Sequence, residues 1–496
     1  MPLRAKVIHP AFAGKAQMAT EASGLDRRHS EQEVIKELPE DEKEDVLFDT
    51  IFGLRTIELN RPKKLHSLNG SMIRKILPRL QEWAKSDMAN VVLIKGVGEK
   101  AFCAGGDVAQ LAKDNKEGPE GQQRSADYFG LEYKLDHLIA TYKKPYVAVM
   151  DGVTMGGGVG LSIHAPFRIA TERTVFAMPE TTIGFFPDVG ASFFLPRMPG
   201  GMGTYLALTS DKLKGVNVYY SGIATHYIHS SSLPALERRL AELRFNDWDT
   251  MQQRLDLIDT TIEEYTTGLP HDQPMLIKGR LRNTIDRIFG DEAKTVDDIL
   301  FELRRSVANK NDDNWHQRTL ETLEKRSPTS VNVTFRQMKL GKRWSIKEAF
   351  QREHQMASKF MKHNDFTEGV SALLIRKDGK PQWEYKDLQA FDRAQKRLGT
   401  DLVDPFFETE GQPLALLTDG DYRTYPFVYG LPQESAVQAL VEQNTLSTKQ
   451  VIDHFVQKTR GKQGVHEVLT DIIDRKTYAS NGKVIWGQQP SRVADA

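Results

Sequence analysis

Two carboxylic acids and two glycine-rich turns are the residues of this sequence whose types and spacing best suit chemistry. Glu180 and Asp188 lie eight positions apart in a turn-rich segment. Glycines stand at 105–106 and at 156–158, each set after an apolar stretch that predicts a strand and before a predicted helix. A carboxylate can act as a general base or as a nucleophile. Free backbone N–H groups at the start of a helix attract negative charge, so the four features together suit an oxyanion hole served by two acids.

Other uses of the glycine turns fit the sequence less well. A single turn of this kind is usually only a connection between a strand and a helix, so the interpretation depends on the pair. The sequence has no P-loop with its lysine and serine or threonine, and residues 156–160 do not match the dinucleotide-binding fingerprint. Nucleotide binding through these turns is therefore disfavoured.

Strands and helices are predicted to alternate around the two turns, which is typical of α/β architecture. The expected strands are short apolar runs at 46–51, 54–59, 91–95 and 146–150. The expected helices lie at about 67–80 and 128–142, with a disordered insert around 114–124. From about residue 200 apolar residues recur at helical spacing, and Thr448 to Lys458 predicts a further amphipathic helix.

Four parts are expected along the chain. A leader and a charged linker occupy residues 1–45, and an α/β core occupies 46–230. A helical part of the same module follows over 231–386. Residues 387–496 form an additional C-terminal domain of mixed α and β structure, because the segment has its own apolar pattern and is not of low complexity.

The bulk composition excludes several classes of protein. The 496 residues include 67 lysines and arginines and 67 aspartates and glutamates, so no overall charge indicates a nucleic acid or an anionic membrane as partner. The single cysteine, Cys103, excludes an intramolecular disulfide and a multi-cysteine zinc site, and it fits a reducing compartment. No apolar run approaches the roughly 18–20 residues that a membrane-spanning helix needs.

The first twenty residues resemble a targeting segment. They contain Arg4, Lys6 and Lys15, and no acidic residue precedes Glu21. An acid-poor start of this kind is typical of a mitochondrial presequence, although a disordered cytosolic tail has a similar composition. We expect the protein in the mitochondrial matrix.

Several motifs resemble the crotonase (enoyl-CoA hydratase/isomerase) superfamily. They are the residues at 60–62 (NRP), 102–107 (FCAGGD), 151–158 (DGVTMGGG) and 178–181 (MPET). Further motifs at 186–190 (FPDVG), 222–226 (GIATH), 327–330 (SPTS) and 365–370 (DFTEGV) resemble the branch that hydrolyses 3-hydroxyisobutyryl-CoA. The resemblance covers about 46–385. It implies a spiral of ββα units followed by helices, an acyl-CoA substrate, no metal, and no cofactor apart from the CoA of the substrate.

The resemblance also implies roles for individual residues. The backbone N–H groups of Gly106 and Gly157 match the oxyanion donors of the family. Glu180 matches its catalytic glutamate, and Asp188 matches the carboxylate of the hydrolase branch. Glu132 matches a substrate-site acid, although a solvated charge on a helix is the plainer interpretation of that residue.

Lys63 and Lys64 are candidates for contacts with the CoA phosphates, and a solvated turn explains them equally well. Cys103 lies beside the first glycine turn, but the family uses that position structurally. His164 and His226 stand without a serine or aspartate arrangement in the sequence, and we expect both to be packing residues.

Gly160 separates two branches of the superfamily. Hydratases carry a second catalytic glutamate two residues after the three glycines, and here that position is a glycine. The resemblance therefore favours thioester hydrolysis by Glu180 and Asp188, as in valine catabolism, over hydration of a double bond. The sequence does not decide whether Glu180 attacks the thioester or activates a water. It also does not separate 3-hydroxyisobutyryl-CoA from 3-hydroxypropionyl-CoA, which differ by one methyl group worth about 1–3 kcal/mol in a pocket.

A structural role is the rival hypothesis. Fungal mitochondrial small ribosomal subunits carry a protein that resembles this hydrolase branch, and the additional C-terminal segment is similar to the fungal form. Small-subunit proteins and rRNA are the partners implied by that resemblance. The two roles can coexist in one chain.

Overall fold

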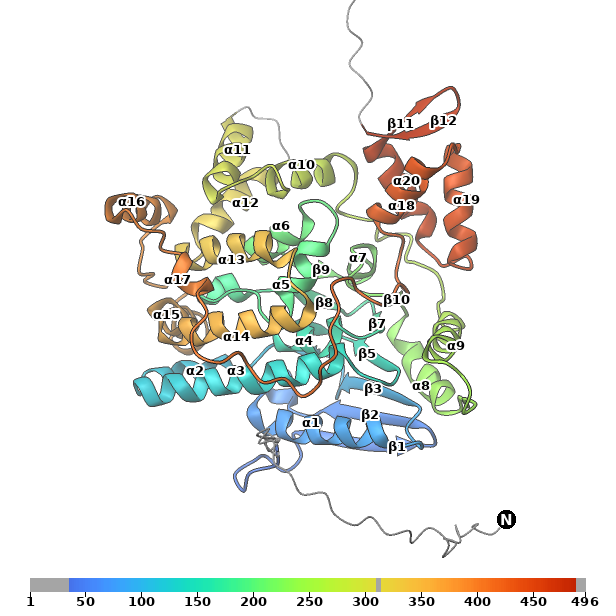
Figure 1. The fold of residues 1–496 in the computed structure, drawn as a ribbon, viewed down its shortest axis with the longest axis horizontal. Coiled ribbons are helices and arrows are strands. Elements are labelled where there is room, and N and C mark those ends of the chain that lie inside the picture. Colours follow the sequence, from blue (N-terminus) through green and yellow to red (C-terminus); the bar gives the residue numbers. More distant parts are fainter. Residues whose placement is uncertain (1–34, 309–313, 488–496) are drawn as a thin grey trace, which may run out of the picture. The chain divides into compact units, whose positions relative to one another are not determined.

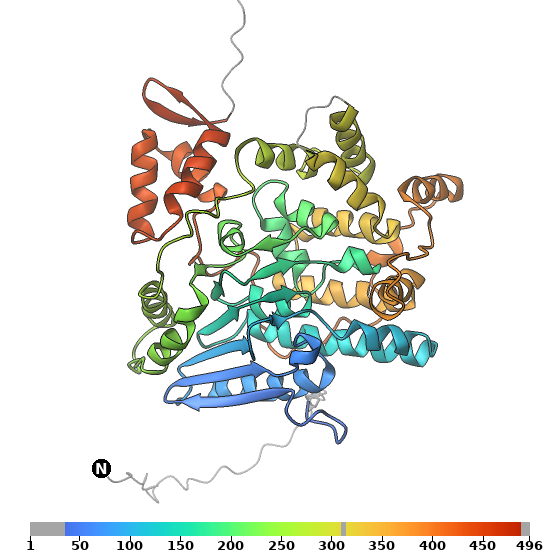
Figure 2. The same cartoon turned by 180° about the vertical axis from the view of Figure 1, so that it is seen from behind.

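A computed structural model describes residues 35–308 and 314–487. The predicted targeting segment lies outside the described residues. Two β-sheets and the helices that follow their strands form the N-terminal half of the described chain, and mostly helical elements follow (Figures 1 and 2). No helix among the described residues is long and apolar enough to cross a membrane.

The larger sheet has six strands in the order β1-β2-β3-β5-β7-β10. β1 and β2 form the predicted antiparallel hairpin, and the later strands add in parallel. The apolar run Tyr146–Met150 is buried throughout, as expected for a parallel strand covered on both faces. The strands are β1 (Val46–Ile51), β2 (Leu54–Leu59), β3 (Val91–Gly96), β5 (Tyr146–Met150), β7 (Phe167–Ala170) and β10 (His226–Tyr227).

The second sheet has four short strands in the order β4-β6-β8-β9. β4, β6 and β8 are parallel neighbours, and β9 closes one edge in the antiparallel sense. They are β4 (Ala101–Cys103), β6 (Val153–Met155), β8 (Val175–Ala177) and β9 (Leu213–Lys214).

The chain passes through both sheets in a repeated order. A strand of the first sheet leads to a strand of the second sheet and then to a helix: β3, β4, α2 (Val108–Asn115); β5, β6, α4 (Gly157–Ile163); β7, β8, η3 (Glu180–Ile183). This repetition confirms the predicted spiral of ββα units. Each of the three helices begins where a strand of the second sheet ends.

The first helix ties the end of the charged linker to the core. α1 (Gly70–Lys85) begins at Asn69, whose side chain accepts a hydrogen bond from the N–H of Met72. The Nζ of Lys75 lies 2.5 Å from Oδ1 of Asp45, and both side chains are buried. The acidic residues next to β1 therefore pack against α1.

The prediction of a disordered insert at 114–124 is wrong. α2 ends at Asn115, Gly118 turns the chain at a φ of +96°, and α3 (Pro119–Ala140) begins at a proline. Glycine tolerates this φ, and a proline in the first helical turn loses no hydrogen bond. The polar residues near 120 are thus the first turns of a long helix that packs on α2.

Helices make up most of the region after β10. They include α8 (Leu233–Ala241), α9 (Met251–Glu263), α10 (Gly279–Phe289), α11 (Val296–Ala308), α13 (Pro328–Gly341), α14 (Ile346–Lys362) and α15 (Asn364–Val370). α14 lies along α3, and its first turn is capped by Ser345 (Figure 1). The apolar spacing of Leu233, Leu236 and Leu240 is confirmed as one face of α8, and these side chains are buried.

After α16 (Leu388–Leu398) and α17 (Asp404–Phe407) the chain crosses the core without regular structure, in a strap over residues 408–433 (Figure 1). The carbonyl of Gly420 in this strap lies 3.0 Å from Nε2 of His137 on α3. The chain then forms α18 (Glu434–Gln443), α19 (Thr448–Lys458), α20 (Val465–Lys476) and the hairpin of β11 (Thr477–Ser480) with β12 (Lys483–Trp486). The predicted helix from Thr448 to Lys458 is confirmed as α19.

Candidate active site

The ends of three neighbouring strands bring the predicted residues together. β4, β6 and β8 run in parallel, so their carboxyl ends meet at one edge of the second sheet. The first glycine turn follows β4, the second follows β6, and Glu180 begins η3 after β8. Residues from three distant segments therefore share this edge, where ligands of parallel sheets commonly bind.

The two glycine turns are in direct contact. Gly105 and Gly156 have φ angles of +104° and +44°. A Cβ atom on Gly156 would lie 3.2 Å from the Cα of Gly105 and 3.2 Å from Oε1 of Glu180. A side chain at either position would strain the backbone, and at Gly156 it would also separate the turns.

Gly106 and Gly157 lie next to each other at this edge. Leu68 forms a parallel bridge with Gly106, in which the N–H of Leu68 donates to Gly105 and the N–H of Asp107 donates to Leu68, each at 2.8 Å. The N–H of Gly106 therefore points away from Leu68. Gly157 is the first residue of α4, where N–H groups have no acceptor within the helix, and its Cβ position lies 3.5 Å from the N of Gly106. Two converging donors are what an oxyanion hole requires.

Glu180 is buried beside the second turn. Glu180 is the first residue of η3, and its Oε2 has no hydrogen-bond partner among the described residues. Burial raises the pKa of Glu180 well above its usual range, and the neighbouring charges of Asp188 and Glu132 raise it further. A carboxyl group with an open oxygen and a raised pKa suits a general base, since it takes a proton readily.

Asp188 faces the same cluster and is held by a tyrosine. The hydroxyl of Tyr133, on α3, donates a hydrogen bond of 2.7 Å to Oδ2 of Asp188. Burial raises the pKa of Asp188 to about 7, against the opposing effect of the Tyr133 hydrogen bond. The side chains of Tyr133 and Asp188 are both buried.

Glu132 lies over the second turn from α3. A Cβ atom on Gly157 would be only 2.5 Å from Oε1 of Glu132, and this oxygen has no hydrogen-bond partner among the described residues. Burial and the charge of Asp188 raise the pKa of Glu132 well above its usual range. The alternative of a solvated helix charge is wrong, because Glu132 is 2% exposed.

Two further buried acids belong to the cluster and were not recognised in the sequence. Asp136 lies one turn beyond Glu132 on α3, and its Oδ2 is 2.5 Å from the position of a Cβ on Gly160. The acid missing from α4 is thus replaced in space by one from α3. Glu353, on α14, accepts hydrogen bonds from the backbone next to Asp188. The i, i+4 spacing of Glu132 and Asp136 was visible in the sequence, but nothing there pointed to Glu353.

The two lysines proposed for CoA lie on the exposed turn η2 (Pro62–Lys64), near the first glycine turn. Nζ of Lys64 is 3.7 Å from Oδ2 of Asp107, the residue after Gly106, and its side chain is 58% exposed. Arg61 also pairs with Asp107, at 3.2 Å. Lys63 and Lys64 are both exposed on this turn, and a contact of either lysine with CoA stays a prediction.

Cys103 and His164 have structural surroundings. Burial raises the pKa of the Cys103 thiol to about 12, so it carries a proton at neutral pH and is a poor nucleophile. Burial lowers the pKa of His164 to about 4, and its Nε2–H donates to the carbonyl of Val189 at 3.0 Å. His164 therefore supports the backbone next to Asp188.

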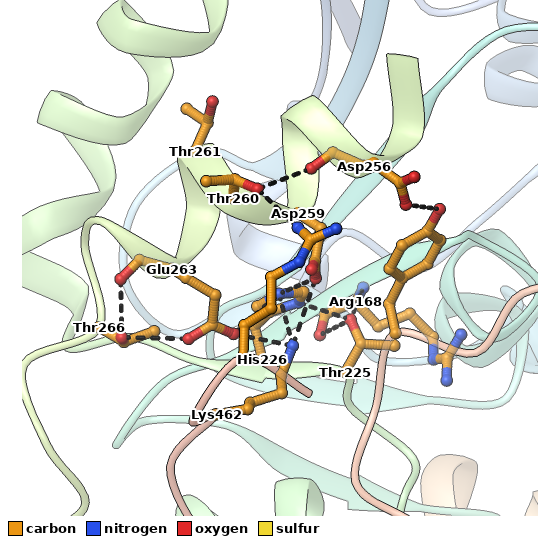
Figure 3. Close-up of polar contacts among 12 residues, drawn as sticks. Arg168, Thr225, His226, Asp256, Asp259, Thr260, Thr261, Glu263, Thr266 and Lys462 are labelled. Atoms are coloured by element: carbon orange, nitrogen blue, oxygen red, sulfur yellow. Dashed lines mark hydrogen bonds and ion pairs between the residues drawn. The ribbon is translucent and has the colours of Figure 1, made fainter. Parts of the chain in front are cut away.

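His226 is buried, as expected for a packing residue, but it also has acidic partners that the sequence did not indicate. Its Nε2 lies 3.1 Å from Asp259 and 3.2 Å from Glu263, both on α9 (Figure 3). Nζ of Lys462, from the loop between α19 and α20, sits between them, 2.9 Å from His226 and 2.8 Å from Glu263. The ammonium group of Lys462 occupies the place that a metal ion would take among His226, Asp259 and Glu263. The cluster is an ion-pair contact that joins the C-terminal helices to the core.

Comparison with known proteins agrees with this fold. The profile described as Enoyl-CoA hydratase/isomerase matches residues 54–397. A solved carnitinyl-CoA dehydratase from Mycobacterium thermoresistibile is 30% identical, has a TM-score of 0.64, and covers 76% of this chain and 100% of its own.

Two kinds of named relatives match at the sequence level. The small ribosomal subunit protein mS47 of Neurospora crassa is 55% identical over 97% of this chain and 93% of its own. The mitochondrial 3-hydroxyisobutyryl-CoA hydrolase of Danio rerio is 44% identical over 68% of this chain and 85% of its own. With the spiral of ββα units and the paired glycine turns, these matches show that the chain belongs to the enoyl-CoA hydratase/isomerase (crotonase) family.

Proposed function

We propose that the protein hydrolyses the thioester of 3-hydroxyisobutyryl-CoA to 3-hydroxyisobutyrate and CoA in the mitochondrial matrix. The observation that carries the proposal is the meeting of the two glycine turns with the buried acids Glu180 and Asp188. Relatives named as mitochondrial 3-hydroxyisobutyryl-CoA hydrolases, about 40% identical, support the choice of substrate and compartment.

In this proposal each group has a task. The N–H groups of Gly106 and Gly157 stabilise the carbonyl oxygen of the thioester as it gains negative charge. Glu180 takes a proton from water while the water oxygen bonds to the carbonyl carbon. The oxyanion then re-forms the carbonyl group as the C–S bond breaks, and the CoA thiolate leaves and takes up the proton that Glu180 holds. Attack by Glu180 itself, through an anhydride that water then cleaves, uses the same positions. Asp188 holds the water or the 3-hydroxyl group of the substrate.

Hydration of an enoyl-CoA fits this site less well, because no acid extends from Gly160 on α4. The carboxyl group of Asp136 fills that space from α3, where it approaches from a different direction. An assay for hydration of crotonyl-CoA beside the thioesterase assay decides between the two reactions.

The test is thioesterase activity on a panel of short acyl-CoAs, with Glu180→Gln and Asp188→Asn as variants. We expect turnover of 3-hydroxyisobutyryl-CoA by the native chain and its loss in Glu180→Gln, with CoA binding retained. Native-rate hydrolysis by Glu180→Gln would contradict the assignment of Glu180.

A second role, as a component of the mitochondrial small ribosomal subunit, is favoured by one specific observation. The relative named as a small ribosomal subunit protein matches 97% of this chain, whereas the hydrolase from Danio rerio matches 68%. The family profile ends at residue 397, and the segment beyond it includes the strap and α18–α20. Co-sedimentation of the tagged protein with mitochondrial ribosomes tests this role, and absence from the small-subunit fraction would exclude it.

A further inference from the structure

The backbone around Asp188 adopts a conformation that needs support from outside. We call residues 187–192 the Asp188 loop. Val189 and Gly190 have φ angles of +54° and +85°, two left-handed residues in succession. A β-branched residue such as valine is strained in this region unless its surroundings hold it there.

Side chains from three helical segments hold the Asp188 loop. Glu353 on α14 uses both of its oxygens: Oε2 accepts from the N–H of Gly190 at 2.7 Å, and Oε1 accepts from the N–H of Ser192 at 2.8 Å. Nε2 of Gln337, on α13, donates to the carbonyl of Pro187 at 2.5 Å. The third contact is the hydrogen bond from His164, at the end of α4, to Val189.

Glu353 is the most informative of these contacts. Its side chain is completely buried. Burial raises its pKa to about 8, even though two backbone N–H groups favour the charged form. A buried carboxyl group is costly, and the two diverging N–H groups of the Asp188 loop need the two acceptors that only a carboxyl group provides.

We infer that Glu353 is a positioning residue for the hydrolysis, acting through Asp188. By fixing the backbone immediately after Asp188, it keeps the carboxyl group of Asp188 on the hydroxyl of Tyr133 and beside Glu180. The inference rests on the proposed hydrolase function. A misplacement of about 1 Å in a catalytic group can lower a rate by about 100-fold, so loss of this support should appear mainly in kcat.

A double-mutant cycle tests the inference. Glu353→Gln keeps the shape of the side chain but replaces one acceptor with an NH2 group that faces a backbone N–H. We expect Glu353→Gln to lower kcat by about 10- to 100-fold with little change in KM. In the Asp188→Asn background, the same change should lower kcat less than twofold, because the group on which Glu353 acts is already lost. If the fold losses in kcat of the two single variants multiply in the double variant, the inference is overturned.

Two further variants keep the test decisive. If Asp188→Asn is too slow to measure, Tyr133→Phe replaces it, since Tyr133 holds the same carboxyl group, and the losses should again fail to multiply. If Glu353→Gln does not fold, Gln337→Met removes the neighbouring contact to Pro187 and should show the same cycle. Multiplying losses with either replacement would overturn the inference.

Asp365→Asn is the matched control. Asp365 is another buried carboxyl group that accepts a backbone N–H, from Glu384 at 2.8 Å, and it also accepts from Ser327. None of the hydrogen bonds described for Asp365 reaches the Asp188 loop. Any loss in kcat from Asp365→Asn should therefore multiply with the loss from Asp188→Asn. A non-multiplying loss for Asp365→Asn would show that the cycle reports general damage and would overturn the inference. A native chain without thioesterase activity would instead refute the proposed function itself.

Discussion

Asp188 sits where small changes in its surroundings decide its charge at neutral pH. Burial raises its pKa to about 7, and the hydrogen bond from Tyr133 opposes that rise because it stabilises the charged form. The buried acids titrate as a coupled set, so a pH profile reports an apparent pKa of that set. If the charged form of Asp188 is the active one, kcat/KM should rise with pH through about 7.

Tyr133→Phe tests this account of Asp188. Removing the donor stabilises the protonated form, so the pKa should rise and the acidic limb of the kcat/KM profile should move to higher pH. The profile for 3-hydroxyisobutyryl-CoA, measured for both proteins, shows the shift. An acidic limb that stays in place, or moves to lower pH, would show that the profile does not report Asp188.

Gly160 and Asp136 form a matched pair. A Cβ on Gly160 would lie 2.5 Å from Oδ2 of Asp136, and both residues are buried. Gly160→Ala should therefore destabilise the protein by about 1–3 kcal/mol, the usual range for overpacking. Adding Asp136→Ala should restore part of the loss, as measured by thermal or denaturant unfolding. A double variant less stable than either single variant would contradict the pairing.

At the scale of single residues, the sequence indicated three of the clustered acids as candidates, but not what holds them. Glu180 and Asp188 stand in recognisable local motifs. Glu353 lies 165 positions beyond Asp188 on a helix whose sequence looks like an ordinary amphipathic surface. Its role depends on how α14 packs, and spacing along the chain does not contain that information.

At the scale of elements, buried strands and capped helices were predictable because their local patterns are strong. β5 and α19 lie where the apolar spacing placed them. The start of α3 was missed because its first turns are polar and follow Gly118-Pro119, which resembles a loop. The partners of His226 were missed because they come from α9 and from the loop before α20, far apart in sequence.

Lys462 links the C-terminal helices to the core. Its side chain is 4% exposed, between Asp259 and Glu263, which are 19% and 26% exposed. Lys462→Met should weaken this attachment by about 2 kcal/mol, less than the ~3–5 kcal/mol expected for fully buried pairs, because water reaches both carboxylates. Hydrogen exchange in α19 and α20 should become faster. Lys458→Met, at the exposed end of α19, is the matched control and should have little effect.

The same contact should depend on pH. The positive charges around Glu263 outweigh its burial and lower its pKa to about 2, and the pKa of Asp259 is lowered as well. A depressed pKa means that the carboxylate stabilises the folded state at pH values above its ordinary pKa of 4.5. This stabilisation is lost as pH falls toward 2. Protection of α19 and α20 should therefore decline in that window in the native protein and less in Lys462→Met. An equal decline in protection in both proteins would show that the contact of Lys462 does not cause the pH dependence.

At the scale of the whole molecule, the site is assembled from most of the described core. The spiral supplies the two glycine turns and Glu180, and α3 supplies Glu132 and Tyr133. α13 and α14 hold the Asp188 loop. The strap over 408–433 crosses the same helices, since Gly420 contacts His137 on α3. The residues beyond 397, where the family match ends, are thus packed against the module that the match covers.

The most direct test of the central claim is kcat/KM for 3-hydroxyisobutyryl-CoA, measured for the native protein and for Glu180→Gln. We predict that the native protein cleaves the thioester and that Glu180→Gln loses activity by at least ~100-fold, the lower range for loss of a general base. Thermal unfolding of the two proteins should be similar, which separates chemistry from folding. Equal rates for the two proteins, or a native protein that hydrates crotonyl-CoA but leaves the thioester intact, would contradict the account.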